Sequence, residues 1–177
     1  NFGYNGSERF DKNNRFGFFP SAGAAWIISN EKFWEDIKPV VSNLKLRYTY
    51  GLIGNDQIGR AEDRFFYLSE VNMDNDGRRA IFGSEYNTVY NGITISRYAN
   101  PYISWEKSYK QNFALELGFW NELNIVAKYF TEKRDNILMD RASIPNTMGL
   151  TATPRANVGE ASGKGVDMML EYQKNWN

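Results

Sequence analysis

The sequence predicts an all-β fold in which antiparallel strands form a segment of a transmembrane β-barrel. Apolar and polar residues alternate with a period of two in two runs that meet at a very short polar break within residues 108–132. Aromatic residues concentrate at both ends of the apolar face, as in strands whose ends lie at the two headgroup layers of a membrane. Long and short connections also alternate along the chain, which is typical of the two rims of an outer-membrane barrel.

The most regular element is a β-hairpin. Residues 108–119 carry apolar side chains at odd positions and mainly polar side chains at even positions, and the alternation resumes at 123–132 after the break at 120–122. Two alternating runs across a tight turn predict two paired strands. The residues expected to face lipid are Phe113, Leu115, Leu117 and Ile125. The residues expected to face the lumen are Lys110, Asn112, Glu116, Lys128 and Glu132.

The elements before the hairpin follow from local patterns. The polar segment 5–14 has turn chemistry, and residues 15–29 alternate well enough to predict a strand in which Pro20 lies at a bulge or an edge. Asn30 is expected to cap a short helical turn that ends at Pro39.

A second clear strand is expected at residues 44–50, ended by the glycines and polar residues of 51–59. Residues 54–101 show no sustained periodicity, although 65–68 and 89–95 are candidates for short strands. An irregular region of this length is uncommon in a compact domain and is usually functional. We therefore expect it to lie outside the membrane and to carry recognition. The aromatic residues that could contact a substrate or partner there are Phe65, Phe66, Tyr67, Tyr86, Tyr90 and Tyr98.

After the hairpin, a polar stretch at 136–163 precedes a last strand at 165–172. The expected long connections (5–14, 54–101 and 136–163) therefore alternate with the short ones (30–43 and 120–122). This asymmetry predicts short periplasmic turns and long extracellular loops. The tryptophans expected to act as interfacial anchors are Trp26, Trp120 and Trp176.

Composition excludes several functions. The 177 residues hold 21 basic and 21 acidic side chains, so no global field attracts nucleic acid. Neither cysteine nor histidine is present, which removes disulfides, thiolate nucleophiles, histidine bases and the usual zinc sites. The sequence contains no apolar run of about 18 residues, so it predicts no transmembrane helix. Because 42% of the residues are hydrophobic, a soluble β-sandwich that binds carbohydrate remains the alternative.

The sequence supports a metal site and a catalytic acid pair only weakly. Residues 72–77 (NMDNDG) resemble the start of a calcium loop, but its twelfth position is Gly83, where a bidentate glutamate is needed. The acid pairs Glu62–Asp63 and Glu8–Asp11 could serve a glycosidase only if one acid had a raised pKa, and nothing in the sequence marks such an acid. The sequence therefore predicts no enzyme, no metal and no cofactor.

Several short motifs carry a resemblance to a known family. They lie at residues 6–10 (GSERF), 15–21 (RFGFFPS), 44–51 (LKLRYTYG), 54–59 (GNDQIG), 100–107 (NPYISWEK), 135–138 (DNIL), 157–160 (NVGE) and 163–166 (GKGV). Together they span almost the whole chain, which resembles the barrel of a SusC/RagA-type TonB-dependent outer-membrane transporter.

The resemblance implies a barrel of about 22 strands around an N-terminal plug. It also implies energy supplied through TonB, and a SusD-like surface lipoprotein that captures oligosaccharides or oligopeptides. Residues 1–177 would form about six of these strands, in contact with outer-membrane lipid. The plug and the TonB box are not matched, so their functions are expected to belong to sequence that is absent here.

Overall fold

The structure is a computed structural model, described here for residues 1–60, 63–141 and 143–174. Its described strands are β1 (Phe2–Gly6), β2 (Phe16–Ile27), β3 (Val41–Asn55), β4 (Glu70–Phe82), β5 (Thr88–Arg97), β6 (Glu106–Phe119), β7 (Leu123–Asp140) and β8 (Arg155–Tyr172). Three single turns of 3-10 helix, η1 (Ile28–Asn30), η2 (Lys32–Trp34) and η3 (Asn146–Met148), lie in the connections. Among the described residues, no helix is long and apolar enough to cross a membrane.

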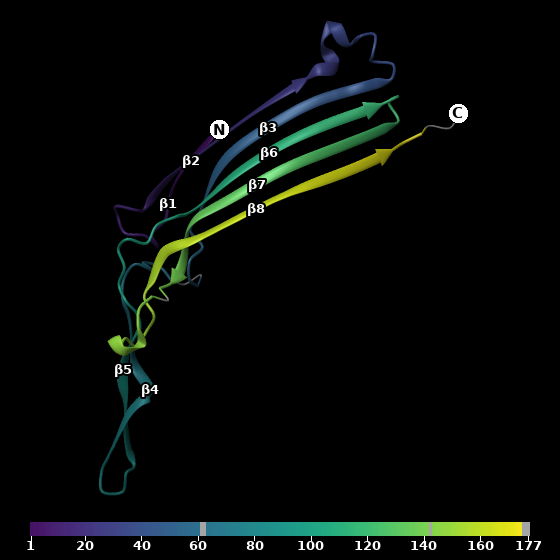
Figure 1. The fold of residues 1–177 in the computed structure, drawn as a ribbon. Helices are drawn as coiled ribbons and strands as arrows, with labels where there is room; N and C mark the ends of the chain where they lie inside the picture. Colours follow the sequence, from purple (N-terminus) through teal and green to yellow (C-terminus); the bar gives the residue numbers. More distant parts are fainter. Residues whose placement is uncertain (61–62, 142, 175–177) are drawn as a thin grey trace.

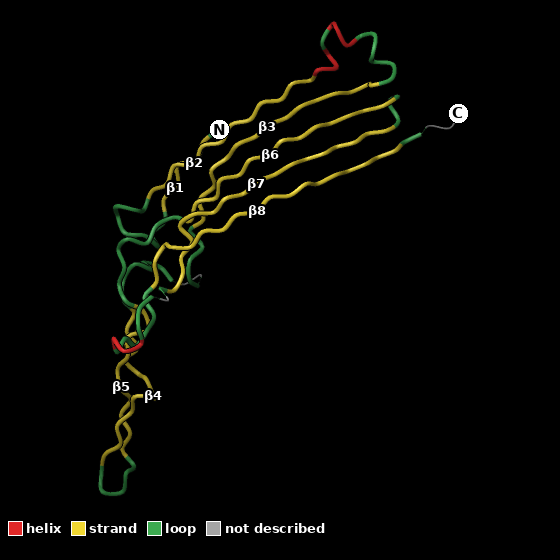
Figure 2. Tube along the Cα trace, viewed as in Figure 1, coloured by secondary structure: helices red, strands yellow, loops and turns green. Residues whose placement is uncertain are grey.

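The strands form one antiparallel sheet and one separate hairpin. The sheet has six strands in the order β1-β2-β3-β6-β7-β8, and β4 pairs only with β5. Figure 1 shows the long strands side by side in a curved sheet, with the β4–β5 hairpin projecting beyond one end. Figure 2 shows that loops gather between the sheet and this hairpin. The predicted all-β, antiparallel architecture is confirmed, and the sheet is open at both edges.

The central hairpin is formed by β6 and β7 around the predicted turn at 120–122. Phe119 pairs with Leu123, and the register continues without interruption to Lys107 and Asp135. Trp120 and Asn121 both have positive φ, 53° and 56°, so the chain reverses through a left-handed turn. The Trp120 N–H donates to the carbonyl of Val40 (3.0 Å), which ties this turn to the neighbouring connection.

The register places like side chains in rows across the sheet. One row contains Trp26, Leu46, Leu115, Ala127 and Met168. The adjacent row contains Ala25, Arg47, Ala114, Lys128 and Asp167, whose side chains point to the opposite face. The five strands β2, β3, β6, β7 and β8 therefore share one apolar face, which we call the outward face, and one polar face, which we call the inward face.

The inward face carries ion pairs and the outward face is uncovered. Lys45 and Arg47 on β3 lie 3.2 and 3.6 Å from the Glu116 carboxylate on β6. On the outward face Met168 and Leu170 are 75% and 69% exposed. A β-sandwich would bury such a face against a second sheet, and no second sheet covers it within the described part of the chain. The structure therefore does not support the sandwich alternative.

Several predicted boundaries were wrong because strands continue through glycine-rich sequence. β3 passes through Gly51 and Gly54 to Asn55, and β7 and β8 leave a connection of only 141–154. Aromatic rings lie over some of these glycines. A Cβ on Gly165 would come 2.6 Å from the Phe130 ring, and the Phe19 ring occupies the corresponding space at Gly54. Glycine therefore makes room for a ring here and does not end the strand.

The connection between β2 and β3 also differs from prediction. Asn30 is the last residue of η1 and not a helix cap; Glu31 precedes η2, and its carboxylate accepts a hydrogen bond from Trp26 Nε1 (2.9 Å). The connection 28–40 is longer than the connection 7–15 on the other rim. The predicted difference in length therefore holds for the turn at 120–122 but not for this one. Pro20 lies where β2 changes its partner from β1 to β3.

The region 54–101 is more regular than predicted. The candidate strand at 65–68 was wrong, because Leu68 N–H donates to the Phe65 carbonyl (2.9 Å) in a tight turn. The candidate at 89–95 is confirmed within β5. Its partner β4 was not predicted, since three register shifts interrupt the pairing and no clean alternation survives.

A small loop core joins the loops near the β4–β5 hairpin to the sheet. It contains the buried side chains Phe10, Phe19, Ile58, Phe66, Ile103 and Trp105, with Leu52 and Leu138 packed against it. The Trp105 ring centroid lies 5.3 Å from that of Phe10 and 5.1 Å from that of Phe19, and its indole N–H donates to the Arg15 carbonyl (3.2 Å). This loop core fixes the segments that form the cavity described next.

Candidate functional site

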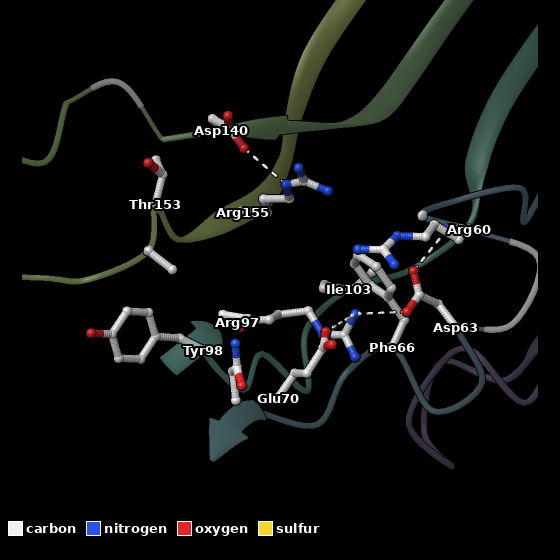
Figure 3. Close-up of a pocket in the computed structure, with 14 residues that line it drawn as sticks. Arg60, Asp63, Phe66, Glu70, Arg97, Tyr98, Ile103, Asp140, Thr153 and Arg155 are labelled. Atoms are coloured by element: carbon white, nitrogen blue, oxygen red, sulfur yellow. Dashed lines mark hydrogen bonds and ion pairs between the residues drawn. The ribbon is translucent and has the colours of Figure 1, made fainter. Parts of the chain in front are cut away.

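A charged cavity of about 750 Å³ lies at the base of the β4–β5 hairpin. Figure 3 shows the side chains that surround it, which come from the loop after β3, the hairpin base, and the adjoining ends of β7 and β8. The charged members are Arg60, Asp63, Glu70, Arg97, Asp140 and Arg155. A cavity of this size is within the range of small-molecule sites.

Two arginine–carboxylate pairs stand at strand ends on opposite sides of the cavity. Glu70 begins β4 and pairs in register with Arg97, the last residue of β5, with 3.4 Å between their charged atoms. Asp140 ends β7 and pairs with Arg155, the first residue of β8, at 2.9 Å. The cavity thus lies between the end of the projecting hairpin and the end of the sheet (Figure 3).

Arg97 is held by several groups at once. Its guanidinium lies 3.4 Å from the Asp63 carboxylate, donates through Nε to the Leu68 carbonyl (3.2 Å), and stands 4.3 Å from the centre of the Phe66 ring. Its side chain is only 18% exposed. These contacts fix the hairpin base to the loop core, because Phe66 belongs to both.

The electrostatics of Asp63 do not suit acid catalysis. The Arg60 backbone N–H donates to the carboxylate (2.8 Å), and this hydrogen bond, with the neighbouring Arg97, holds the pKa of Asp63 below its ordinary value against the opposing effect of burial. A general acid would need a raised pKa. The proposed partner Glu62 lies outside the described residues. In the other acid pair, Glu8 accepts a hydrogen bond from Arg64 Nε (2.6 Å).

The segment 100–105 positions the cavity relative to the sheet. Asn100 Nδ2 donates to the Arg155 carbonyl (2.7 Å), and its backbone N–H donates to the Tyr67 carbonyl (2.9 Å). Asn157 on β8 exchanges two 3.0 Å hydrogen bonds with the backbone of Ser104. This one short segment therefore ties the β4–β5 hairpin to β8.

The predicted recognition aromatics divide into two groups. Phe66 and Tyr98 line the cavity, but Phe66 is 2% exposed and supports the wall. The Thr151 backbone N–H donates to the Tyr98 hydroxyl (3.2 Å), and hydrogen bonds with Thr151 lower the pKa of Tyr98. Phe65 and Tyr67 pack edge to face in the neighbouring turn, with ring centroids 6.5 Å apart.

The other two aromatics lie on the projecting hairpin. Tyr86 is in its turn, at a φ of 53°, and is the more exposed of the two. Tyr90 is on β5, with its ring 5.9 Å from that of Phe82 on β4. Other exposed apolar side chains of this hairpin are Val71, Met73, Ile81, Val89 and Ile93. The hairpin thus offers an apolar and aromatic surface apart from the cavity.

The candidate calcium ligands belong to the same hairpin. Asn72, Asp74 and Asp76 are part of β4, and Asp74 accepts a hydrogen bond from Asn91 Nδ2 (2.6 Å). Among the described residues, no group of three or more acidic side chains converges in a way that could hold a metal ion.

The predicted wall residues share one face. Phe113, Leu115, Leu117 and Ile125 all lie on the outward face, and Trp26 lies in the same row as Leu115. Trp120 is exposed in the turn after β6. Trp176 lies outside the described residues. Contact of these side chains with lipid, and of Trp26 and Trp120 with the membrane interface, stays a prediction.

Sequence reasoning missed the charged cavity. Its arginines and acids are distant along the chain, and only the pairing of strand ends brings them together. A signal was present in the oppositely charged residues that flank both hairpins, Glu70 with Arg97 and Asp140 with Arg155. Guanidinium and carboxylate groups that face one cavity can bind a polar ligand carrying both charges, or the hydroxyl groups of a sugar.

Comparisons with known proteins agree on one family. Residues 1–177 match the family described as TonB dependent receptor-like, β-barrel. The TonB-dependent receptor SusC of Bacteroides thetaiotaomicron is 31% identical over 169 residues, which is 94% of this chain and 16% of that protein. The TonB-dependent receptor P3 of Formosa agariphila is 30% identical over 166 residues, 93% of this chain and 15% of that protein.

A solved structure shares both fold and sequence. The RagAB peptide importer in its "closed-closed" state superposes with a TM-score of 0.75 at 28% identity, and covers 99% of this chain and 18% of the solved chain. The names of these relatives describe receptors and an importer and not enzymes. The chain spans less than a fifth of the length of each relative.

Proposed function

Because the chain belongs to the TonB dependent receptor-like β-barrel family, we propose that it forms one section of the wall of an outer-membrane importer. The whole transporter would take up oligopeptides or oligosaccharides, with energy supplied through TonB by parts of the protein outside this chain. A SusD-like surface lipoprotein would be its partner. The relatives named as the receptor SusC and as a peptide importer support this proposal.

The observation that carries the proposal is the separation of the two sheet faces. The neighbouring strands β3, β6, β7 and β8 present uncharged side chains outward from the row of Leu44 and Leu117 to the row of Tyr48 and Phe113, and Lys45 pairs with Glu116 inward. Hydrocarbon tolerates the first face and excludes the second. The outward face would contact lipid, and the inward face would contact the lumen or a plug.

The loops on the cavity side would lie outside the cell. The β4–β5 hairpin and the adjoining turn carry Arg60, Arg64, Asp74 and Arg79, a density of charge that cannot lie in hydrocarbon. We assign the exposed surface around Tyr86 and Tyr90 to contact with the lipoprotein. We assign the cavity between Arg97 and Arg155 to contact with substrate on its way to the lumen.

Uptake by the full-length transporter tests these assignments. Arg155→Gln removes a half-exposed guanidinium from the cavity rim, and Lys12→Gln removes an exposed charge from another loop on the same rim. In cells given a fluorescently labelled tryptic digest of casein or a labelled hydrolysate of a plant glycan, Arg155→Gln should slow uptake of one of the two. Lys12→Gln should slow neither.

If Arg155→Gln leaves uptake unchanged, the cavity does not contact substrate during transport. The lipoprotein assignment is tested separately by Tyr86→Ala with Tyr90→Ala. Co-purification of a surface lipoprotein with the full-length protein should decrease in this double variant while outer-membrane levels of the transporter stay the same. Undiminished co-purification would contradict the assignment.

A further inference from the structure

The outward face changes from uncharged to charged along an oblique line of lysines. Going up each strand from the turn at 120–122, the first outward-facing charged residue is Lys164 on β8, Lys133 on β7 and Lys107 on β6. Lys164 lies in the row of Thr131 and Gln111. Lys133 lies one outward row higher, opposite Tyr109, and Lys107 one row higher again. We call these three residues the lysine line.

The lysine line crosses the rows of the sheet obliquely, as a flat boundary crosses tilted strands. Barrel strands tilt by about 35–45°, and with a rise of about 3.3 Å per residue and a spacing of about 4.8 Å, a level boundary shifts by about one to one and a half residues per strand. Over the two steps from β8 to β6 such a boundary would shift by about two to three residues, and the lysine line shifts by four. The lysine line therefore lies nearer to such a plane than to a row of the sheet, and it rises more steeply than the plane.

The charge of these three residues indicates which chemical groups would lie beside them. All three residues are lysines. Lys133 lies 3.0 Å from Asp135 and 4.0 Å from Glu160, whereas Lys107 and Lys164 have no ion-pair partner within 4 Å in the described part of the chain. Lys107 and Lys164, which make no ion pair there, complement phosphate groups above an uncharged band, because a long lysine stem can lie on apolar surface while its ammonium reaches an anion.

A surface cleft of about 680 Å³ lies at two of these three lysines. It is lined by the aromatic side chains of Tyr50 and Tyr109 and by Lys133 and Lys164. Glu132 and Asp135 also line it. Tyrosine rings beside a lysine are typical of the boundary between hydrocarbon and headgroups. The cleft thus combines an apolar floor with two lysines and two carboxylates, of which Asp135 pairs with Lys133.

We propose that the lysine line marks the outer-leaflet headgroup layer and that the cleft at Lys133 and Lys164 binds a phosphate-bearing lipid headgroup. This inference rests on the proposed placement of the outward face in the outer membrane. It adds a specific lipid site, and it places Gln111 and Thr131 at the level of the headgroups, although Phe113 and Tyr129 directly below them lie in hydrocarbon.

Native mass spectrometry of the full-length protein tests the site. The protein in detergent is titrated with phosphatidylglycerol and with phosphatidylcholine, as wild type, as Lys133→Gln/Lys164→Gln, and as the control Lys110→Gln/Lys128→Gln. The control removes two lysines from the inward face of β6 and β7. The wild type and the control should retain phosphatidylglycerol in preference, and Lys133→Gln/Lys164→Gln should lose about tenfold or more of this preference.

The outcomes separate this inference from the proposed function. Equal lipid retention in all three proteins would overturn the headgroup site, and so would displacement of the lipid by inorganic phosphate alone, which would indicate a simple anion site. A nitroxide at Leu115 reports on the outward face independently. If this nitroxide is accessible to oxygen but not to a water-soluble nickel complex in vesicles, the outward face lies in lipid. This result does not depend on whether the lysines bind a headgroup.

Discussion

Leu117 on β6 lies directly opposite Ile125 on β7, and its chain neighbour Glu116 lies on the other face within 3.2 Å of Lys45. Adjacent residues of one strand thus belong to two different environments. This relationship extends over five strands because their registers are continuous in this region. It is the structural basis of the wall assignment.

The first prediction concerns charge on the outward face. Leu117→Arg in the full-length protein should destabilise the inserted barrel by about 2–4 kcal/mol, because the guanidinium would lie in hydrocarbon. Heat-modified mobility of the purified outer-membrane fraction measures the folded barrel. The yield of folded protein should decrease.

The neighbouring substitution is the matched control. Glu116→Gln removes the ion pairs with Lys45 and Arg47, which are partly exposed and contribute about 1 kcal/mol or less. Folded yield should stay close to that of the wild type. Equal damage from the two changes would mean that odd positions of β6 do not face lipid.

The second prediction concerns the loop core. Trp105→Ala removes a ring that contacts Phe10 and Phe19 and should cost about 3–5 kcal/mol of local stability. Tyr102→Ala, three residues away at an exposed position, should change stability by about 0.5 kcal/mol or less. Hydrogen exchange of the amides of residues 56–69 should accelerate in the first variant only. If exchange there is unchanged, the loops are held by something other than this core.

The third prediction is a pH dependence. The pKa of Asp63 is lowered in the folded protein, so the stabilisation from its ionised form is fully present above the ordinary value near 3.8 and is lost as the pH falls through the lower folded value. Pepsin cleavage within 56–105 should therefore increase steeply only below about pH 4. In Asp63→Asn the pair with Arg97 is already absent, so cleavage should be faster at pH 4 and rise less on acidification. Identical profiles would rule out a role for Asp63 in holding the hairpin base.

The sequence was sufficient to predict the strands of the sheet where one face is uniformly apolar. The period of two around Phe113 and Leu117 predicted both strands of the central hairpin, their turn and their faces, because outward and inward environments differ sharply there. The same pattern correctly located β3 and β8 around Leu46 and Met168.

Elsewhere the pattern was lost for physical reasons. Gly54 resembles a strand end, but in the fold it accommodates the ring of Phe19, which comes from the neighbouring strand. Register shifts in the β4–β5 hairpin removed its alternation. The cavity depends on Arg97 and Arg155 meeting through strand ends far apart in sequence, and a local pattern does not contain that information.

Topology across the membrane tests the central claim most directly. Single cysteines at Ser84, in the turn of the β4–β5 hairpin, and at Asn121, in the turn between β6 and β7, are introduced into the full-length protein, in which any other cysteine is first replaced. Both sites lie outside strands and are exposed. Because β3 and β6 lead to opposite rims, an impermeant thiol reagent should label Ser84→Cys on intact cells and Asn121→Cys only after the outer membrane is broken. Labelling of Asn121→Cys on intact cells, with Ser84→Cys protected, would contradict the proposed orientation, and labelling of both on intact cells would contradict a membrane-spanning wall.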